Sequence, residues 1–432
     1  MAARARDDRP NVVLVVTDDQ RAESLQSMPL VRGLLAEKGT TFSNAMVPTS
    51  RCCPSRAAIL TGLFSHRTQV FDNSTDPRSR FGGWATFHRR GLEFRSLAMV
   101  LQRAGYRTGL FGKYFNGFTD ATPEDHTSPG WDRMRVFQNR PASYYRYRLT
   151  DGTWRGQDPR DYSTDVLAAE SRRFIRSTPA DQPLFLMYTP FAPHSPYLAA
   201  PRHAGADLDV PAVDIGSAPG EGEPAWRVHR SAAESRFAAS VPLAQTRSLL
   251  AVDEAVQSLV GTLRRTERMR DTFFVFMSDN GYLWGEHGLI GKDVPYDAAL
   301  RIPLVVRWDG HVPAGRVDRR LALNLDLAGT IARVAGTEMA TDGLDLLRER
   351  RRGGFVVEGT YGYAGRPAYC GWRTRRHLYV RFADGRTELF DYRRDPAEQR
   401  NLAGTRAVGG LEKRLQAKAR RECVPEPPGF DW

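Results

Sequence analysis

The chain has 432 residues, with 62 basic against 50 acidic side chains, 41% hydrophobic residues, 38 glycines and 27 prolines. This is the composition of a globular protein with a large core, and it excludes disordered, collagen-like and coiled-coil proteins. The net charge of +12 favours polyanionic partners, meaning nucleic acid, anionic lipid, or sulfated and phosphorylated compounds, although a mixed solvated surface accounts for most of it. Only five of the 62 basic residues are lysines, so a lysine in a motif raises the question whether an ammonium group is needed there.

No stretch of the sequence approaches the ~18 apolar residues of a membrane span, and residues 1–10 are polar and arginine-rich, without the apolar segment of a signal peptide. We therefore expect no membrane span, and either a protein that stays inside the cell or a chain that begins near a mature terminus. The four cysteines do not make a disulfide framework. Cys370 and Cys423 could form a bridge in an exported protein or remain free thiols, whereas a disulfide between the adjacent Cys52 and Cys53 would be strained.

Short apolar segments alternate with segments of helical periodicity, which is the pattern of an α/β protein. The expected strands are Val12–Val16, Thr108–Phe111, Leu184–Tyr188, Thr272–Met277 and Leu304–Arg307. The expected helices are Met28–Lys38, Leu92–Ala104, Asp165–Ile175, Leu243–Arg264 and Leu325–Ala335. Because the strands are apolar throughout, we predict a large, mostly parallel central sheet with helices on both faces. The carboxyl ends of its strands would meet at one edge, where open α/β sheets bind ligands.

The sequence changes character near residue 340, which predicts a large domain of residues 1–340 and a C-terminal subdomain of residues 341–432. The elements of a small antiparallel sheet and a terminal helix are expected at Phe355–Glu358, His377–Phe382, Thr387–Tyr392 and Leu411–Arg420. Two long stretches, Phe71–Arg90 and Ala200–Arg236, are typical of lids or binding walls. The side chains expected to wall a pocket there and nearby are Trp84, His88, Tyr144, Tyr145 and Trp226.

Oxygen-bearing side chains follow two of the predicted strands at the point where each ends. Asp18 and Asp19 follow the first strand, and Asp279 and Asn280 follow the fourth. Such residues suit a hard cation, Ca²⁺ or Mg²⁺, better than zinc, because no cysteine or histidine accompanies them at ligand spacing. Each pair alone is weak, since aspartate and asparagine often begin loops. Their occurrence after two buried strands predicts a cation site at the edge of the sheet.

The strongest motif is Cys-x-Pro-Ser-Arg, which begins at Cys52 and should arise by chance in roughly one chain in a thousand of this size. Pro54 suits the first turn of a helix, so Cys52 would stand at a helix N-terminus, where backbone N–H groups bind oxyanions, with Arg56 one turn further on. Lys113 follows the second predicted strand and His194 the third. Four strands would thus bring polar groups to the same edge.

With these motifs the chain resembles the sulfatase family over nearly its whole length, and most closely its glucosamine-6-sulfatase and arylsulfatase-like branch. The resemblance implies an alkaline-phosphatase-like α/β fold whose catalytic site lies in residues 1–340, followed by a smaller α+β subdomain that contains an antiparallel sheet. The residues that carry it are those at 9–11, 18–20, 52–56, 60–62, 109–114, 192–196, 278–281, 285–287, 292, 296, 388–391, 395–396 and 401–402.

The resemblance also implies a set of roles. Cys52 would be oxidised to formylglycine, or 3-oxoalanine, by a formylglycine-generating enzyme, and the hydrated aldehyde would supply the nucleophile. The implied calcium ligands, with magnesium as an alternative ion, are Asp18, Asp19, Asp279, Asn280 and the modified Cys52. The implied groups that hold the sulfate or serve the modified residue are Arg56, Lys113, His194 and Lys292.

One position departs from the family pattern. Many members carry histidine two residues after the lysine that matches Lys113, whereas this chain has Phe115 and then Asn116. The glucosamine-6-sulfatase-like branch similarly lacks that histidine. The group that deprotonates the reaction intermediate is therefore open, and Asn116 is a candidate substrate contact.

We therefore expect hydrolysis of a sulfate ester on a sugar or an aryl alcohol. Family members are commonly exported, which leaves the compartment open. The alternative enzyme class is phosphonate monoester or phosphodiester hydrolysis with the same nucleophile, since the same cations would serve either anion. A non-catalytic polyanion-binding protein, in which Cys52 is never oxidised, is a further alternative. Nucleic-acid binding is not expected, because the sequence contains no recognised module or basic helix.

Overall fold

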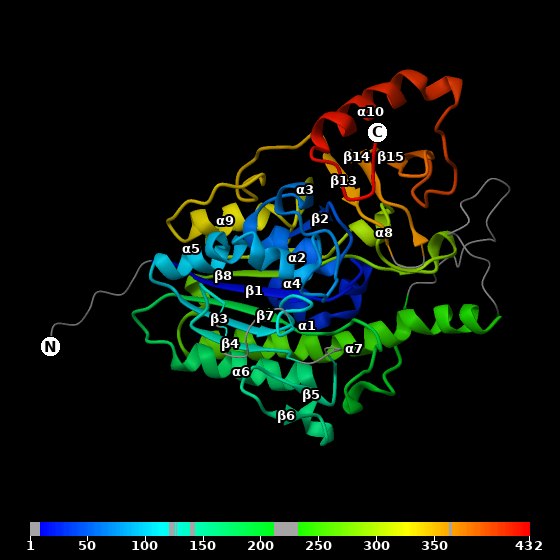
Figure 1. The fold of residues 1–432 in the computed structure, drawn as a ribbon. Coiled ribbons are helices and arrows are strands. Elements are labelled where there is room, and N and C mark those ends of the chain that lie inside the picture. Colours follow the sequence, from blue (N-terminus) through cyan, green and yellow to red (C-terminus); the bar gives the residue numbers. More distant parts are fainter. Residues whose placement is uncertain (1–8, 121–125, 127, 139–142, 211–231, 363–364) are drawn as a thin grey trace.

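The computed structural model describes residues 9–120, 126, 128–138, 143–210, 232–362 and 365–432 (Figure 1). Eight strands form the central sheet: β1 (Asn11–Thr17), β2 (Thr40–Met46), β3 (Arg107–Gly112), β4 (Arg133–Val136), β7 (Leu184–Thr189), β8 (Thr272–Ser278), β11 (Leu304–Arg307) and β12 (Arg316–Leu323). Their order is β12-β2-β11-β8-β1-β7-β3-β4. Every neighbouring pair is parallel except the two that β11 makes with β2 and β8. The predicted α/β fold with a mostly parallel sheet is confirmed.

Ten α-helices lie among the described residues: α1 (Pro29–Val31), α2 (Cys52–Thr61), α3 (Ser65–Thr68), α4 (Gly83–Arg89), α5 (Leu97–Arg103), α6 (Ser163–Ser177), α7 (Ala232–Arg265), α8 (Asp297–Leu300), α9 (Asp326–Val334) and α10 (Gly409–Glu422). Single helical turns include η1 (Glu23–Ser27), η2 (Arg32–Ala36), η3 (Leu92–Arg95), η4 (Pro159–Asp161), η5 (Pro201–His203), η6 (Met269–Asp271), η7 (Glu286–Gly288) and η9 (Arg406–Val408). None of these helices has the length and hydropathy needed to cross a membrane.

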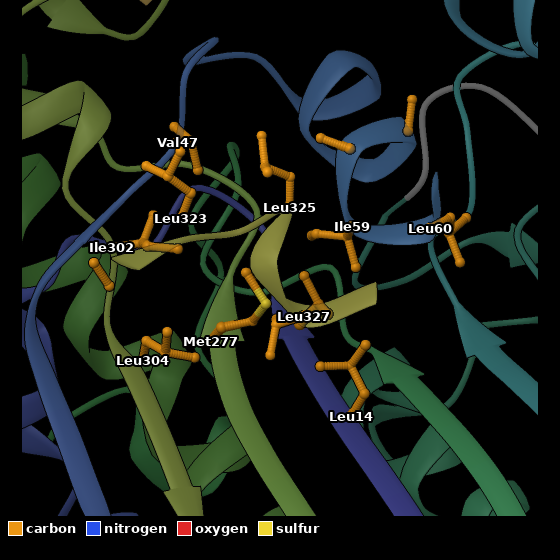
Figure 2. Packing of buried hydrophobic residues seen from close by; sticks show 14 of the residues in the cluster. Leu14, Val47, Ile59, Leu60, Met277, Ile302, Leu304, Leu323, Leu325 and Leu327 are labelled. Atoms are coloured by element: carbon orange, nitrogen blue, oxygen red, sulfur yellow. The ribbon is translucent and has the colours of Figure 1, made fainter. Parts of the chain in front are cut away.

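Helices cover both faces of the sheet, because its strands are apolar on both sides. α6 and α7 lie on one face, and α2, α5 and α9 lie on the other (Figure 1). Along β1, Val13 and Val15 pack with the first group of helices, while Val12, Leu14 and Val16 pack with the second. Figure 2 shows Ile59 of α2 and Leu327 of α9 facing Leu14 on the sheet. This two-sided burial holds the strand ends, and the residues that follow them, in fixed positions.

The first of the two long stretches expected to be lids or binding walls is helical in part. The stretch Phe71–Arg90 contains the helix α4, and Trp84 on that helix is fully buried rather than part of a pocket wall. Tyr144 is likewise fully buried. Residues 211–231 of the second stretch, including Trp226, lie outside the described residues. Short two-stranded sheets complete the main fold: β5 (Tyr147–Arg148) with β6 (Trp154–Arg155), and β9 (Leu283–Trp284) with β10 (Ile290–Gly291).

The C-terminal part forms the predicted small antiparallel sheet with a terminal helix. Its strands, in order, are β13 (Phe355–Gly359), β14 (Tyr369–Arg373), β15 (His377–Phe382) and β16 (Thr387–Asp391). α10 packs across this sheet, with Leu415 against Tyr379 (Figure 1). A disulfide between Cys370 and Cys423 ties β14 to the end of that helix. Because the largest hydrophobic cluster continues from the main sheet into β13 and β15, the boundary at residue 340 remains a proposal.

Candidate active site

Four oxygen-bearing residues meet where β1 and β8 end. These neighbouring parallel strands are paired to their last residues, so the residues that follow both of them emerge side by side. We call this group the acidic cluster: Asp18, Asp19, Asp279 and Asn280. All four are at most 2% exposed. Asp19 adopts φ +69°, and its backbone N–H donates to Asp279 Oδ1 at 3.1 Å, which turns the chain back over the second strand. Carboxylate oxygens of the three aspartates and Cys52 Sγ all lie within 4.8 Å of one another.

Cys52 is the first residue of α2, as its motif predicts. Its side chain is fully buried, and Sγ lies 3.3 Å from Asp18 Oδ1 and 4.0 Å from Asp19 Oδ1. The neighbouring Cys53 points elsewhere, where its Sγ accepts a hydrogen bond from Asn116 N at 3.3 Å. The two adjacent cysteines therefore have different surroundings, and only Cys52 faces the acidic cluster.

Three cations, which we call the cationic group, surround the acidic cluster: Arg56, Lys113 and Lys292. Arg56, fully buried in α2, donates from Nε to Asp279 Oδ2 at 2.9 Å and from Nη1 to the Lys113 carbonyl at 2.6 Å. The Lys113 Nζ atom lies 2.5 Å from Asp18 Oδ2 and 3.3 Å from Cys52 Sγ. The arginine thus fixes the chain that presents the lysine, and the lysine reaches the cysteine directly.

Lys292 contacts Cys52 although it lies 240 residues further along the chain. Its Nζ lies 2.7 Å from Cys52 Sγ and also contacts Asp19 Oδ1. The backbone carbonyl of Lys292 accepts a hydrogen bond from Arg366 of the C-terminal part. His194 lies further out, with Nε2 3.7 Å from Asp19 Oδ2 and 30% of its side chain exposed. The structure therefore brings every residue of the predicted metal and catalytic sets into one group around Cys52.

Burial and charge have opposite effects on the pKa values of this group. Burial raises the pKa of the Asp18 carboxyl, but Lys113 and the other nearby cations outweigh that effect and hold the pKa well below its usual range. Burial lowers the pKa of the Lys113 ammonium, but Asp18 outweighs it and raises the pKa. For Cys52, burial and the Asp18 charge both raise the pKa of the thiol. Asp18 and Lys113 thus remain an ion pair, and an unmodified Cys52 would be a protonated, weak nucleophile.

A cavity of about 340 Å³ opens beside the cationic group. Lys113, Asn116 and His194 line it, so the predicted substrate contact Asn116 faces the same space as two members of the site. Polar residues that the motifs did not indicate also line it, and they are Thr75, Thr119, Asp120 and Gln138. The Oε1 atom of Gln138 is buried and has no hydrogen-bond partner among the described residues. Gln138 follows the end of β4, so recognising that strand would have pointed to it.

Two other motif residues, His287 and Tyr296, lie outside the cavity lining. The His287 ring stacks on Tyr296 with centroids 4.0 Å apart, and its Nε2 lies 3.4 Å from Glu398 Oε2. The Tyr296 hydroxyl donates to Glu388 Oε2 at 3.0 Å. Both contacts join the chain around Lys292 to the C-terminal part, since Glu388 lies in β16 and Glu398 follows that strand.

A mostly parallel eight-stranded sheet, an acidic cluster with three cations at its carboxyl edge, and a small C-terminal antiparallel sheet define an alkaline-phosphatase-like fold. A family profile described as Sulfatase matches residues 10–337, and one described as N-sulphoglucosamine sulphohydrolase, C-terminal, matches residues 285–423. The chain therefore belongs to the sulfatase family.

Curated relatives agree with this assignment. The chain is 34% identical to the extracellular sulfatase SULF-1 homolog of Drosophila melanogaster, over 81% of this chain and 32% of that protein. It is 34% identical to the N-acetylglucosamine-6-sulfatase of Homo sapiens, over 78% of this chain and 64% of that protein. The chain thus spans between about a third and two thirds of the length of these relatives.

Solved structures share the whole fold. One, solved in complex with its substrate D-glucosamine-2-N,6-O-disulfate, has a TM-score of 0.81 at 22% identity and covers 97% of this chain and 99% of its own. The phosphonate monoester hydrolase of Agrobacterium radiobacter has a TM-score of 0.77 at 20% identity and covers 96% of this chain and 95% of its own. At these identities the likeness establishes the fold alone.

Proposed function

We propose that this protein hydrolyses the sulfate ester of a sugar, with glucosamine 6-sulfate as the first substrate to test. The observation that carries the proposal is the convergence of Lys113 Nζ and Lys292 Nζ on Cys52 Sγ, at 3.3 and 2.7 Å. Arg56 adds a third cation, since it bonds to the Lys113 carbonyl at 2.6 Å, and Lys113 also lines the cavity. Two of the chain's five lysines meet there, in a sequence that otherwise uses arginine almost everywhere. The name of the human relative, N-acetylglucosamine-6-sulfatase, supports a sugar substrate.

We propose that the acidic cluster holds a calcium ion, with magnesium as the alternative. The donor set fits, because it consists of buried oxygen atoms, which are the ligands that these cations prefer. Asn280 Oδ1 in particular is buried and has no hydrogen-bond partner among the described residues, so it is available to a cation. The three carboxylates are balanced by the cationic group, and a bound dication would add the positive charge that stabilises a sulfate ester in its transition state.

We further propose that a formylglycine-generating enzyme oxidises Cys52 to formylglycine. The hydrated aldehyde would supply one hydroxyl to attack sulfur and a second whose deprotonation releases sulfate, a route that an unmodified cysteine or serine lacks. The position of Cys52 suits this role, since its Sγ lies between both lysine ammonium groups and two aspartates. Lys113 and Lys292 would hold the sulfate oxygens in place and stabilise the charge that develops on them.

We propose that His194 donates a proton to the leaving sugar oxygen. Its Nδ1 bonds to the Ser195 carbonyl at 2.8 Å, which orients Nε2 toward Asp19 and the cavity. Lys292 is the other candidate for this role, but its ammonium is enclosed between Asp19 and Cys52. We therefore assign the general acid to His194 and the anchoring of the sulfate to Lys292.

This assignment predicts that His194→Ala affects substrates according to their leaving group. Hydrolysis of glucosamine 6-sulfate should slow by about 10²–10⁴-fold, because an alkoxide needs a proton to leave. Hydrolysis of 4-nitrophenyl sulfate should slow much less, because nitrophenolate leaves without one. Steady-state kinetics on both substrates measure the difference. Lys292→Ala is the control variant, and it should slow the hydrolysis of both substrates to a similar extent. If His194→Ala also slowed both substrates equally, the general acid would be Lys292 instead.

The sulfate assignment is tested against phosphonate hydrolysis by comparing kcat/KM on 4-nitrophenyl sulfate and on a matched aryl phosphonate. We expect the sulfate to be the better substrate by several-fold, because the family profile and the curated relatives that the chain matches are those of sulfatases. Calcium-loaded protein and equal ionic strength are needed for both reactions. A large preference for the phosphonate would reject the sulfate ester as the main substrate.

A further inference from the structure

A second group of metal-ligand types lies behind the cavity wall, away from Cys52. His88 stands near the end of α4, Glu93 lies in η3, and His126 belongs to the chain that follows the cavity-lining residues 113–120. One nitrogen of each histidine and one oxygen of Glu93 all lie within 4.8 Å of one another. We call these three residues the Glu93 cluster. It shares no residue with the acidic cluster, and the proposed sulfatase reaction makes no use of it.

The Glu93 carboxylate is fully buried and lacks a permanent cation. Its Oε1 lies 2.5 Å from His88 Nδ1, its Oε2 lies 3.3 Å from His126 Nε2, and Ser128 Oγ donates to Oε2 at 3.3 Å. Within the part of the chain that the structure describes, its ion-pair partners are these two histidines, and no lysine or arginine joins them. A buried carboxylate is costly unless a positive charge compensates it. A bound dication would compensate it.

The donor types favour a transition metal over calcium. Two imidazole nitrogens and one carboxylate oxygen are the protein ligands of many zinc sites that keep a position open for water. A zinc ion with bonds of about 2.1 Å would separate its ligand atoms by about 3.4 Å, so side-chain shifts on the order of 1 Å would form the site. About 41% of the His88 side chain and 19% of the His126 side chain are exposed, which leaves a path for the ion and room for water.

The surrounding residues hold these ligands in place. The Trp84 ring stacks on His88 with centroids 5.6 Å apart and packs against His126 at 5.8 Å. Ser128, which bonds to Glu93, lies 3.3 Å from the Tyr114 hydroxyl. Outer contacts of this kind orient metal ligands and raise affinity for the ion. The Glu93 cluster is thus supported on both its imidazole and its carboxylate side.

We propose that the Glu93 cluster binds one zinc ion, or a similar transition-metal dication, with water in the remaining position, and that the ion stabilises the fold there. The ion would join α4 and η3 to the chain that carries Lys113 and Asn116. That chain already packs on the same tryptophan, since the Trp84 ring contacts Tyr114 at 5.3 Å and Phe118 at 4.8 Å between centroids. Zinc would therefore stabilise the back of the cavity wall without touching the reacting groups.

The test is zinc binding to full-length, tag-free protein in saturating calcium, which keeps the acidic cluster occupied. Isothermal titration calorimetry should find one zinc site in the wild type, and zinc should raise its melting temperature. Glu93→Gln and His126→Ala should each weaken zinc binding by about 100-fold and remove the thermal shift. His311→Ala is the matched control, because that histidine stacks on Trp308 outside the cluster, and it should bind zinc like the wild type.

Cobalt gives a second measurement that does not depend on stability. Co²⁺ bound to the Glu93 cluster should produce visible absorption bands of a site with nitrogen and oxygen ligands, and these bands should be missing in Glu93→Gln. That variant preserves the volume of the side chain, so it carries the test even where His126→Ala does not fold. If the wild type binds zinc no better than Glu93→Gln, the proposal is wrong and the cluster is a hydrogen-bonded carboxylate–imidazole group only. Sulfatase activity is not the readout, so failure of this proposal leaves the proposed function untouched.

Discussion

Replacing Cys52 with alanine should lower kcat on a sulfate ester by about 10⁴-fold or more, because it removes the atom on which the nucleophile is built. Binding of the sulfate should persist, since Arg56, Lys113 and Lys292 all remain. The measurement is steady-state turnover, combined with mass spectrometry of the tryptic peptide that begins at Cys52. In the active wild type, that peptide should carry an aldehyde in place of the thiol.

The adjacent cysteine provides a matched control. Cys53 is equally buried, but its Sγ contacts the backbone of Asn116 and faces away from the acidic cluster. Cys53→Ala should therefore retain turnover within about tenfold of the wild type and keep the aldehyde at position 52. An entirely unmodified thiol at position 52 in active, metal-loaded protein would contradict the proposed mechanism, and inactivity with an unmodified thiol would favour a polyanion-binding protein.

Asp279→Ala is expected to abolish turnover and to weaken calcium binding. Asp279 pairs with Arg56 at 2.9 Å and accepts the Asp19 backbone N–H at 3.1 Å. Its loss therefore removes a proposed metal ligand, unpairs a buried guanidinium and loosens the turn after β1. Removing one partner of a buried ion pair, which leaves the other charge unpaired, costs about 3–5 kcal/mol of stability. The measurements are a calcium titration by calorimetry, turnover, and thermal unfolding with and without calcium.

A buried aspartate elsewhere separates loss of the site from loss of stability. Asp326 is 1% exposed and pairs with Arg352, with no contact to the acidic cluster. Asp326→Ala should lower the melting temperature but leave calcium affinity and the kcat of the folded protein unchanged. In the wild type, removal of calcium with a chelator should stop turnover, and added calcium should restore it. Wild-type turnover that survives both chelation and Asp279→Ala would refute the metal assignment.

The parts of the fold that the sequence predicted are those with a continuous apolar signal. All five predicted strands are present, as β1, β3, β7, β8 and β11, because each is buried on both faces. Three strands of the central sheet were missed because they are polar in part: β2 carries exposed and half-buried residues, β4 is mostly half-buried, and the edge strand β12 begins with the exposed Arg316 and Val317. The antiparallel direction of β11 was also not predictable, since a four-residue apolar strand reads the same in either direction.

The candidate site was predictable where its residues directly follow strands or belong to a rare motif. The parallel register of β1 and β8 converts two sequence positions some 260 residues apart into neighbours, as the hydrogen bond from Asn280 to Asp19 shows. Lys292 could be assigned only by family resemblance, because it follows a two-residue strand in an irregular region. The Glu93 cluster had no signal at all: its three residues occur at unrelated spacings, and only the packing around Trp84 brings them together.

The hydrogen bond from Arg366 to the Lys292 carbonyl has a consequence for recombination between relatives. Arg366 and Lys292 lie on opposite sides of residue 340 in the sequence. A second contact also joins the two parts of the chain, because Arg373 donates a hydrogen bond to the Asp297 carboxylate at 2.6 Å. A chimera that joined residues 1–340 of this chain to the C-terminal part of another sulfatase would take Lys292 from this chain. The residue that bonds to the Lys292 carbonyl would come from the other protein. The contacts between the two parts therefore depend on residues from both parents. A functional chimera would need to take residues 290–300 and the C-terminal sheet from the same parent.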